Sequence, residues 1–247
     1  MSHFFDVIIN LISTLMGFLI HSGWNAIKDR YRKNNLIQLW HPFLNSEFKV
    51  VISHYSNQKF KDQGYQSTGF REQGGFMAYG DAMATATLQA FFESAGITKF
   101  SIVSDENIQG DDLKNNLILI GGPIANVITK QVMEKVNTSF KFEGKDGAIK
   151  DSVTKRNYIP NFDRQPNEQS IDYSLVIFTY NPFDPTKKVI IIAGSLAFGT
   201  WAGARYLISR LSKKLAPKGR TNFECLLETD VMFETPQAIR TIQIRHL

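Results

Sequence analysis

The chain is short of the residues from which disulfides and metal sites are built. Of its 247 residues one is a cysteine, Cys225, which excludes an internal disulfide or a thiolate cluster and favours a reducing compartment. None of the five histidines has a partner at metal-ligand spacing, so we expect no metal and no cofactor. The ordinary hydrophobic and charged fractions, 43% and 21%, exclude a disordered, collagen-like or polytopic membrane protein.

Positive charge is confined to two segments. The net charge is +5, but residues 1–46 carry +2, residues 205–220 carry +6 and the rest of the chain carries −3. The second segment is either the solvated end of a helix or a surface that faces an anion or a membrane. Nucleic acid is not expected as a partner, because the basic cluster lacks interleaved aromatic residues beyond Tyr206. If both segments face the same side, they predict contact with an anionic membrane surface.

Residues 4–20 form a strongly apolar run, and no basic n-region precedes it. A cleaved signal peptide is therefore not expected. Polar residues recur in it every three or four positions. A membrane helix that packs against its own copies, an interfacial helix and a helix packed on the protein's own domain all fit this stripe. The lysines and arginines that follow would keep the bulk of the chain in the cytoplasm. We therefore expect residues 1–35 to be a membrane-anchoring helix with a basic flank, crossing the inner or cell membrane once, with a cytoplasmic protein as the alternative.

The remaining residues, 36–247, are expected to form one domain in which strand and helix patterns alternate. Runs of β-branched and apolar residues predict strands at 48–54, 99–103, 116–120, 172–179, 188–193, 223–233 and 239–246. Helices are expected at 81–95, 124–136 and 199–214, and a hairpin at 140–153. Near-continuous apolar strands between helices favour a mostly parallel sheet that is covered on both faces, with the last two strands as antiparallel additions.

Glycine turns mark where a ligand would bind, since ligands of open α/β sheets sit where strands lead into helix N-termini. The expected ligand-binding residues are Ser53, His54, Tyr79, Gly80, Asp81, Gly121, Gly122, Gly194, Ser195, Gly199 and Thr200. The run at 194–200 resembles a relaxed phosphate loop but lacks the lysine and the full spacing of a Walker A motif. A tight turn with close strand–helix packing is the alternative.

Candidate catalytic residues are few. His54 could act as a base at a strand end, and Asp105 with Glu106 could bind ribose hydroxyls. Each could equally be an ordinary loop residue. Ser195 lacks the context of a nucleophile elbow, so the sequence leaves open whether the protein is an enzyme.

Two segments resemble known domains: LILIGGPIAN at 117–126 and NPFDPTKKVIIIAGSLAFGTWAGARYL at 181–207. Their GGPxAN and NPF…IIIAGS…GT patterns are similar to Rossmann-like domains of archaeal surface-layer proteins. The general pattern also resembles SLOG-type nucleotide-sensing domains joined to membrane helices in prokaryotic defence systems. The resemblance implies an α/β, Rossmann-like three-layer sandwich, with a mostly parallel sheet, antiparallel C-terminal strands and an added N-terminal apolar helix. It supplies no catalytic residues.

These observations lead to one main hypothesis and two alternatives. The chain is expected to be a membrane-anchored cytoplasmic sensor or effector, with prokaryotic antiviral defence as its candidate setting. It would bind a nucleotide or small anionic ligand, touch the membrane through its first helix and form a homo-oligomer. One alternative is a soluble enzyme that cleaves a glycosidic bond in a nucleotide-like substrate, with Asp81, Asp105 and Glu106 as its candidate acids. The other is a non-catalytic scaffold.

Overall fold

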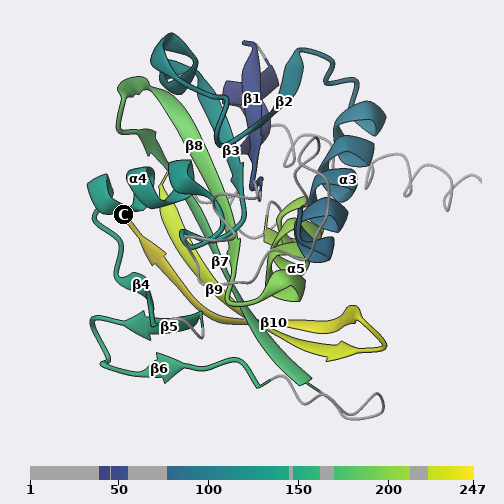
Figure 1. Ribbon diagram of the computed structural model, residues 1–247, viewed down its shortest axis with the longest axis vertical. Coiled ribbons are helices and arrows are strands. Elements are labelled where there is room, and N and C mark those ends of the chain that lie inside the picture. Colours follow the sequence, from purple (N-terminus) through teal and green to yellow (C-terminus); the bar gives the residue numbers. More distant parts are fainter. Residues whose placement is uncertain (1–38, 45, 55–76, 145–146, 162–169, 212–221) are drawn as a thin grey trace, which may run out of the picture.

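The computed structural model describes residues 39–44, 46–54, 77–144, 147–161, 170–211 and 222–247 (Figure 1). Residues 39–44 are helical. The helices that follow are α3 (Tyr79–Ser94), η1 (Gly110–Lys114), α4 (Val127–Lys135), α5 (Ala197–Tyr206) and η2 (Leu207–Leu211). The strands are β1 (Phe48–Ile52), β2 (Phe100–Ser104), β3 (Asn116–Ile120), β4 (Phe140–Glu143), β5 (Ala148–Asp151), β6 (Asn157–Tyr158), β7 (Ser170–Asn181), β8 (Asp184–Gly194), β9 (Phe223–Met232) and β10 (Thr235–His246).

The strands form a mixed seven-stranded sheet in the order β10-β9-β7-β8-β3-β1-β2 and a small three-stranded sheet, β4-β5-β6. In the large sheet, β8, β3, β1 and β2 run parallel to one another. The longer strands β7, β9 and β10 extend it with antiparallel pairs, and the small sheet is antiparallel throughout. The prediction of a mostly parallel, Rossmann-like sheet is therefore wrong.

The prediction was wrong because an apolar strand indicates burial and does not indicate strand direction. β3 is buried along its whole length. Ile118 and Ile120 pack on one face of the sheet, while Leu117 and Leu119 pack on the other. Such a run shows that both faces are covered, which is common in parallel sheets but says nothing about strand direction here. The tight turn between β7 and β8 makes them a hairpin, and β8 is the strand that meets β3.

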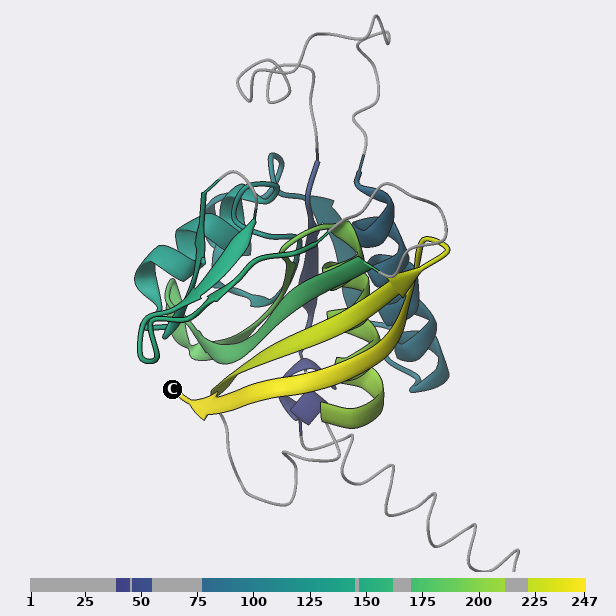
Figure 2. The ribbon, with the colours of Figure 1, turned by 90° about the horizontal axis from the view of Figure 1, so that it is seen from below.

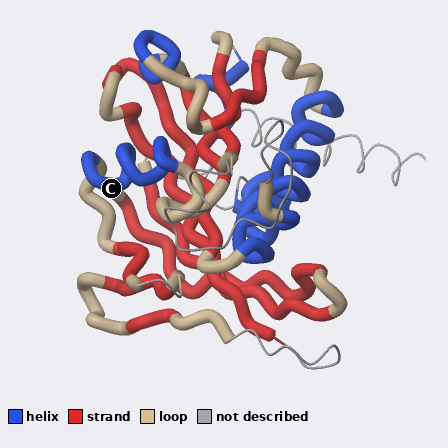
Figure 3. Tube along the Cα trace, viewed as in Figure 1, coloured by secondary structure: helices blue, strands red, loops and turns tan. Residues whose placement is uncertain are grey.

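Different elements cover the two faces of the large sheet (Figures 1 and 3). Residues 39–43, α3 and α5 cover one face. Their core includes a cluster of aromatic rings in mutual contact: Trp40, Phe43, Phe48, Phe92 and Phe100. Helix α4 and the small sheet cover the other face and bury a second, mainly aliphatic core. Figure 2 shows the small sheet and the β9–β10 hairpin reaching out to opposite sides of the molecule.

The predicted membrane anchor needs a correction. In the part of the chain that the structure describes, no helix is long and apolar enough to cross a membrane. The prediction of a transmembrane helix, and with it the single-pass placement in the inner or cell membrane, is therefore not supported by the structure. Residues 4–20, which suggested the N-terminal apolar helix, lie outside the described residues.

Candidate functional site

A cleft of about 230 Å³ opens beyond the carboxyl ends of β3 and β8. The first turns of α3 and α5, the turn that leads to α4, Phe142 on β4 and Gly147 just before β5 surround it. Five residues predicted to bind a ligand line this cleft: Asp81, Gly122, Gly194, Ser195 and Thr200. The structure thus brings together residues from three separate turns, because parallel strands end at the same edge of a sheet.

Asp81 is the buried acid of the cleft. Ser53 at the end of β1 donates a hydrogen bond of 2.6 Å from Oγ to Asp81 Oδ2. Gly121 lies so close that a Cβ there would stand 3.0 Å from the same oxygen. Burial raises the pKa of Asp81 above its ordinary value, against the opposing hydrogen bonds of Ser53 and Thr200. The carboxyl therefore holds a proton more readily than an exposed one and suits a polar neighbour better than an anion.

The glycines beside the cleft serve close packing. A Cβ on Gly80 would stand 1.8 Å from the carbonyl oxygen of Ala197, and one on Gly199 would stand 2.1 Å from that of Tyr173. Side chains at these positions would therefore push α3 away from α5, and α5 away from the sheet. This geometry supports the alternative of tight strand–helix packing.

Asp172 on β7 occupies the start of α5, which has no capping side chain of its own. Its Oδ1 accepts the backbone N–H of Leu196 at 3.0 Å and its Oδ2 accepts that of Gly199 at 2.5 Å. Its carboxylate is fully buried, and burial raises its pKa to about 6, against the hydrogen bonds from these amides. Sequence reasoning missed Asp172. The available signal was an acid at the start of an apolar strand.

Other backbone N–H groups of the run at 194–200 also donate hydrogen bonds within the protein. The N–H of Gly194 donates to Thr200 Oγ1 at 3.1 Å. The N–H of Ser195 donates to the carbonyl of Tyr173 at 2.8 Å. A phosphate at this turn would have to displace these bonds and those of Asp172.

His54 belongs to a different cluster, at the ends of β1 and β2. Its Nδ1 lies 3.1 Å from Glu106 Oε2. Asp105 accepts the N–H of His54 at 2.9 Å and that of Val127, in the first turn of α4, at 2.8 Å. Asn126 caps the same helix through its side-chain oxygen. Asp105 therefore stabilises the start of α4, Glu106 contacts the His54 ring, and neither acid lines the cleft.

Tyr79 stands at the outer surface of α3. Its side chain is 55% exposed, and its ring contacts Phe198 and Trp201 at centroid distances of 6.4 and 6.2 Å. It does not line the cleft.

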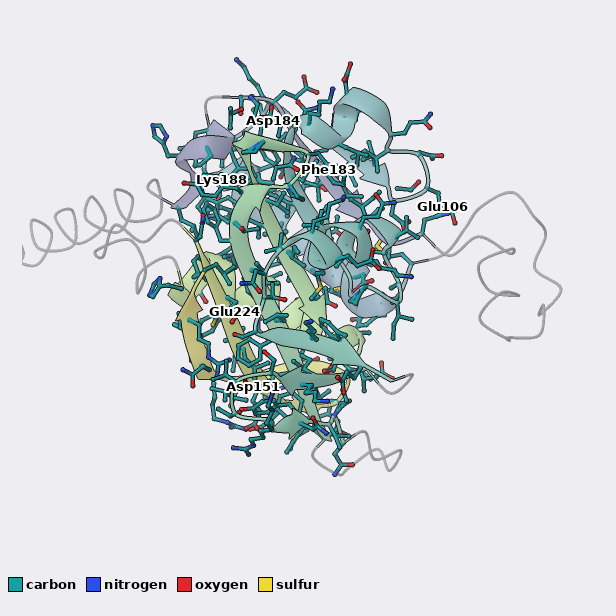
Figure 4. All side chains as sticks on the ribbon, turned by 90° about the vertical axis from the view of Figure 1, so that its left-hand side faces the viewer. Glu106, Asp151, Phe183, Asp184, Lys188 and Glu224 are labelled. Carbon is teal, nitrogen blue, oxygen red and sulfur yellow. The ribbon has the colours of Figure 1, made fainter. Side chains whose placement is uncertain are left out.

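A second polar cluster, which sequence reasoning missed, joins the small sheet to the large one. We call it the joint: Ser139, Asp151, Glu224 and Arg245 (Asp151 and Glu224 are labelled in Figure 4). The Arg245 guanidinium donates to both oxygens of Asp151, at 2.7 and 2.6 Å, and holds the pKa of that carboxyl well below its usual range. The two residues are 94 positions apart, so no local pattern could have paired them.

Metal ligands do not gather anywhere in the described residues, where no group of three or more His, Cys, Asp and Glu side chains could hold an ion.

Comparison with known proteins gives one family. None of the curated proteins compared with the chain matches it. The family described as "S-layer like family, outer domain" matches residues 79–211, from α3 to η2, which is more than half of the chain. The match supports the resemblance to surface-layer proteins and not the resemblance to SLOG-type nucleotide sensors. By this match, the chain belongs to the S-layer like family, outer domain.

Proposed function

We propose that this chain is a structural building block of a surface-layer-type assembly. It acts through contacts with other protein molecules, and neither catalysis nor nucleotide binding is its task. The family match supports this proposal, because the family is named for surface layers. The observation that carries it is the position of Asp172. Its carboxylate accepts the backbone N–H groups at the start of α5 that a phosphate ligand would need.

The charges around the cleft are unfavourable for the phosphates of a nucleotide. Helix N-termini attract phosphate through free N–H groups and a positive dipole, but a buried carboxyl already occupies the start of α5. The described residues that line the cleft include no Lys, Arg or His. A phosphate would meet the acid Asp81 without a counter-charge. The nucleotide-sensor hypothesis stays a prediction that these contacts do not favour.

The glycosidic-bond hydrolase also loses support. Such enzymes place two carboxyl groups on either side of the bond that is cleaved. Asp81 lines the cleft, whereas Asp105 and Glu106 belong to the cluster around His54. The cleft thus holds one of the three candidate acids.

A second candidate function has one observation in its favour. The Ser195 hydroxyl is buried, lines the cleft and has no hydrogen-bond partner among the described residues. Together with the Asp81 carboxyl it could bind a small, uncharged, polar molecule. Native mass spectrometry of the purified protein tests this candidate: a bound small molecule that is lost in Ser195→Ala would support it.

Self-association of the purified full-length chain tests the main proposal. We expect sedimentation velocity to show assembly that grows with concentration, and electron microscopy to show ordered arrays or rows. Thr200→Val is the matched control, because it alters the cleft without touching the outer surface. A chain that stays monomeric, or whose assembly requires a nucleotide, would contradict the proposal.

A further inference from the structure

The turn of the β9–β10 hairpin exposes a large apolar side chain. Phe233 is 71% exposed and Met232 is 37% exposed. Phe233 and Glu234 both have positive φ, at 49° and 55°. Two-residue turns of this kind favour Asn and Gly, and a bulky residue in this region is an unusual, strained choice. A phenylalanine held outward at such a turn indicates that its side chain is needed for a contact.

The same hairpin carries negative charge beside its exposed ring. Glu228, Asp230 and Glu234 lie on it. Arg240 donates to Glu228 at 3.0 Å and to Asp230 at 2.7 Å. Two of these carboxylates share one guanidinium, and Glu234 at the exposed turn adds a third negative charge, so the hairpin end keeps a net negative charge. We call Met232, Phe233, Glu234 and these acids the tip, which is apolar at its centre and acidic around it.

A groove of about 970 Å³ between α4 and β4 has the complementary character. Its apolar lining residues are Pro123, Ile124, Val127, Met133, Val136 and Phe142, of which Ile124 is 49% and Val127 is 38% exposed. Its charged lining residues are Lys130, Lys135, Lys141 and Glu134. All three lysines are exposed, so the groove is apolar at its floor and basic at its rim.

The backbone of β4 adds a polar contact to this groove. β4 lies at the edge of the small sheet. The N–H of Ser152 donates to the carbonyl of Ser139, which makes these two residues a hydrogen-bonded pair between the strands. Such pairs alternate along antiparallel strands, so the N–H and C=O of Phe142 point away from β5 and toward the groove.

The turn of the β9–β10 hairpin lies on one side of the molecule, and α4 and β4, which border the groove, lie on the opposite side (Figures 1 and 2). We propose that the tip of one copy inserts into the α4–β4 groove of the next copy, with Phe233 on the apolar floor and the tip acids beside the groove lysines. This inference rests on the proposed function and names the contact through which assembly takes place. A head-to-tail contact of this kind joins copies into rows or rings.

Two variants test the two sides of the contact. Phe233→Asn removes the ring and suits the positive φ, so the fold should be unharmed. The double variant Lys130→Glu with Lys141→Glu reverses the groove charge on exposed side chains. Each is expected to weaken self-association about tenfold or more in sedimentation velocity, because a central aromatic anchor and its paired charges dominate small interfaces. Thermal melting of each variant checks the fold.

Cross-linking locates the contact directly. Under oxidation, a mixture of Glu234→Cys and Lys141→Cys proteins should form a disulfide-linked dimer, while the native Cys225 is buried and stays reduced. Lys114→Cys, exposed on η1, replaces Lys141→Cys in the control mixture and should not cross-link.

The outcomes separate this contact from the proposed function. Assembly by the wild type that both surface variants leave unchanged, without the cross-link, overturns the contact and leaves the building-block proposal standing. A wild type that stays monomeric overturns both. Loss of assembly in both variants together with the specific cross-link supports the contact.

Discussion

Asp172 beside the cleft and Asp151 in the joint are both fully buried, yet their pKa values move in opposite directions. Backbone amides hold Asp172, and its pKa rises to about 6 because burial outweighs them. The Arg245 guanidinium holds Asp151, and its pKa falls. Asp172 lies deep in the fold with amide donors alone, whereas Asp151 lies nearer the surface and has a full positive charge besides its own amide and hydroxyl donors, so the effect of burial is outweighed only at Asp151. The comparison teaches that the two regions should respond oppositely to pH.

The largest expected effect comes from disrupting the contact between α3 and α5 beside the cleft. Gly80→Ala would place a Cβ 1.8 Å from a backbone oxygen of α5, and backbone atoms cannot move aside cheaply. We expect a loss of about 4 kcal/mol or more in the free energy of unfolding, measured by urea denaturation. Gly96→Ala is the control, because it has positive φ but nothing within 4 Å, and it should cost about 1 kcal/mol. Equal losses in the two variants would show that the α3–α5 contact is not tight.

The next largest effect comes from removing the Arg245–Asp151 ion pair in the joint. Arg245→Ala leaves the buried Asp151 without its cation and removes a guanidinium that lies 4.6 Å from the Phe140 ring centroid. We expect a loss of about 3 kcal/mol or more. Arg240→Ala on the same strand is the matched control, since that side chain is 48% exposed, and its loss should cost about 0.5 kcal/mol. The idea fails if the two variants are equally stable.

The smallest effect sharpens the comparison through pH. The folded pKa of Asp172 lies above its unfolded value, so the folded state binds the proton more tightly. Stability from this group is therefore present at about pH 4 and declines as the pH rises through about 6, by on the order of 2–3 kcal/mol. Asp151 has the opposite sign, since its folded pKa is lowered, and its contribution declines below about pH 4.

Asp172→Asn tests which group carries the decline. Denaturation between pH 4 and pH 7 should lose its slope in this variant, while the decline in stability below pH 4 remains. The asparagine side chain offers one oxygen where two helix amides need acceptors, so about 1–3 kcal/mol should also be lost at pH 4. An unchanged slope would assign the decline to another group.

The positions of the strands were predictable, whereas their arrangement was not. Runs such as NLILI at 116–120 and the Asp-Gly hairpin near 147 carry local signals, and the structure confirms a strand and a hairpin there. The antiparallel direction of β7 and β8 follows from the short connection between Asn181 and Asp184, because parallel neighbours need a crossover of about a dozen residues or more. The short turn between them was visible in the sequence, but the strand–helix alternation around it favoured the wrong interpretation.

The cleft was partly predictable for a related reason. Glycine turns at strand ends pointed to residues that do meet, because parallel strands β3 and β8 end together. Asp172 comes from an antiparallel strand and reaches the same place from the other direction. The joint depends on residues from β5 and β10 that are far apart in the chain. The joint has no local sequence pattern, and Asp172 has only the weak one of an acid at the start of an apolar strand.

Strand β8 also has a consequence for the order of folding. It pairs with β7 across a short turn and with β3 across the long stretch of chain from Leu117 to Val189. Closing a short loop loses less entropy than closing a long one. The β7–β8 hairpin should therefore form before the parallel half of the sheet docks against it. Conservative changes on β8, such as Ile191→Val, should then slow folding more than changes of equal cost on β2.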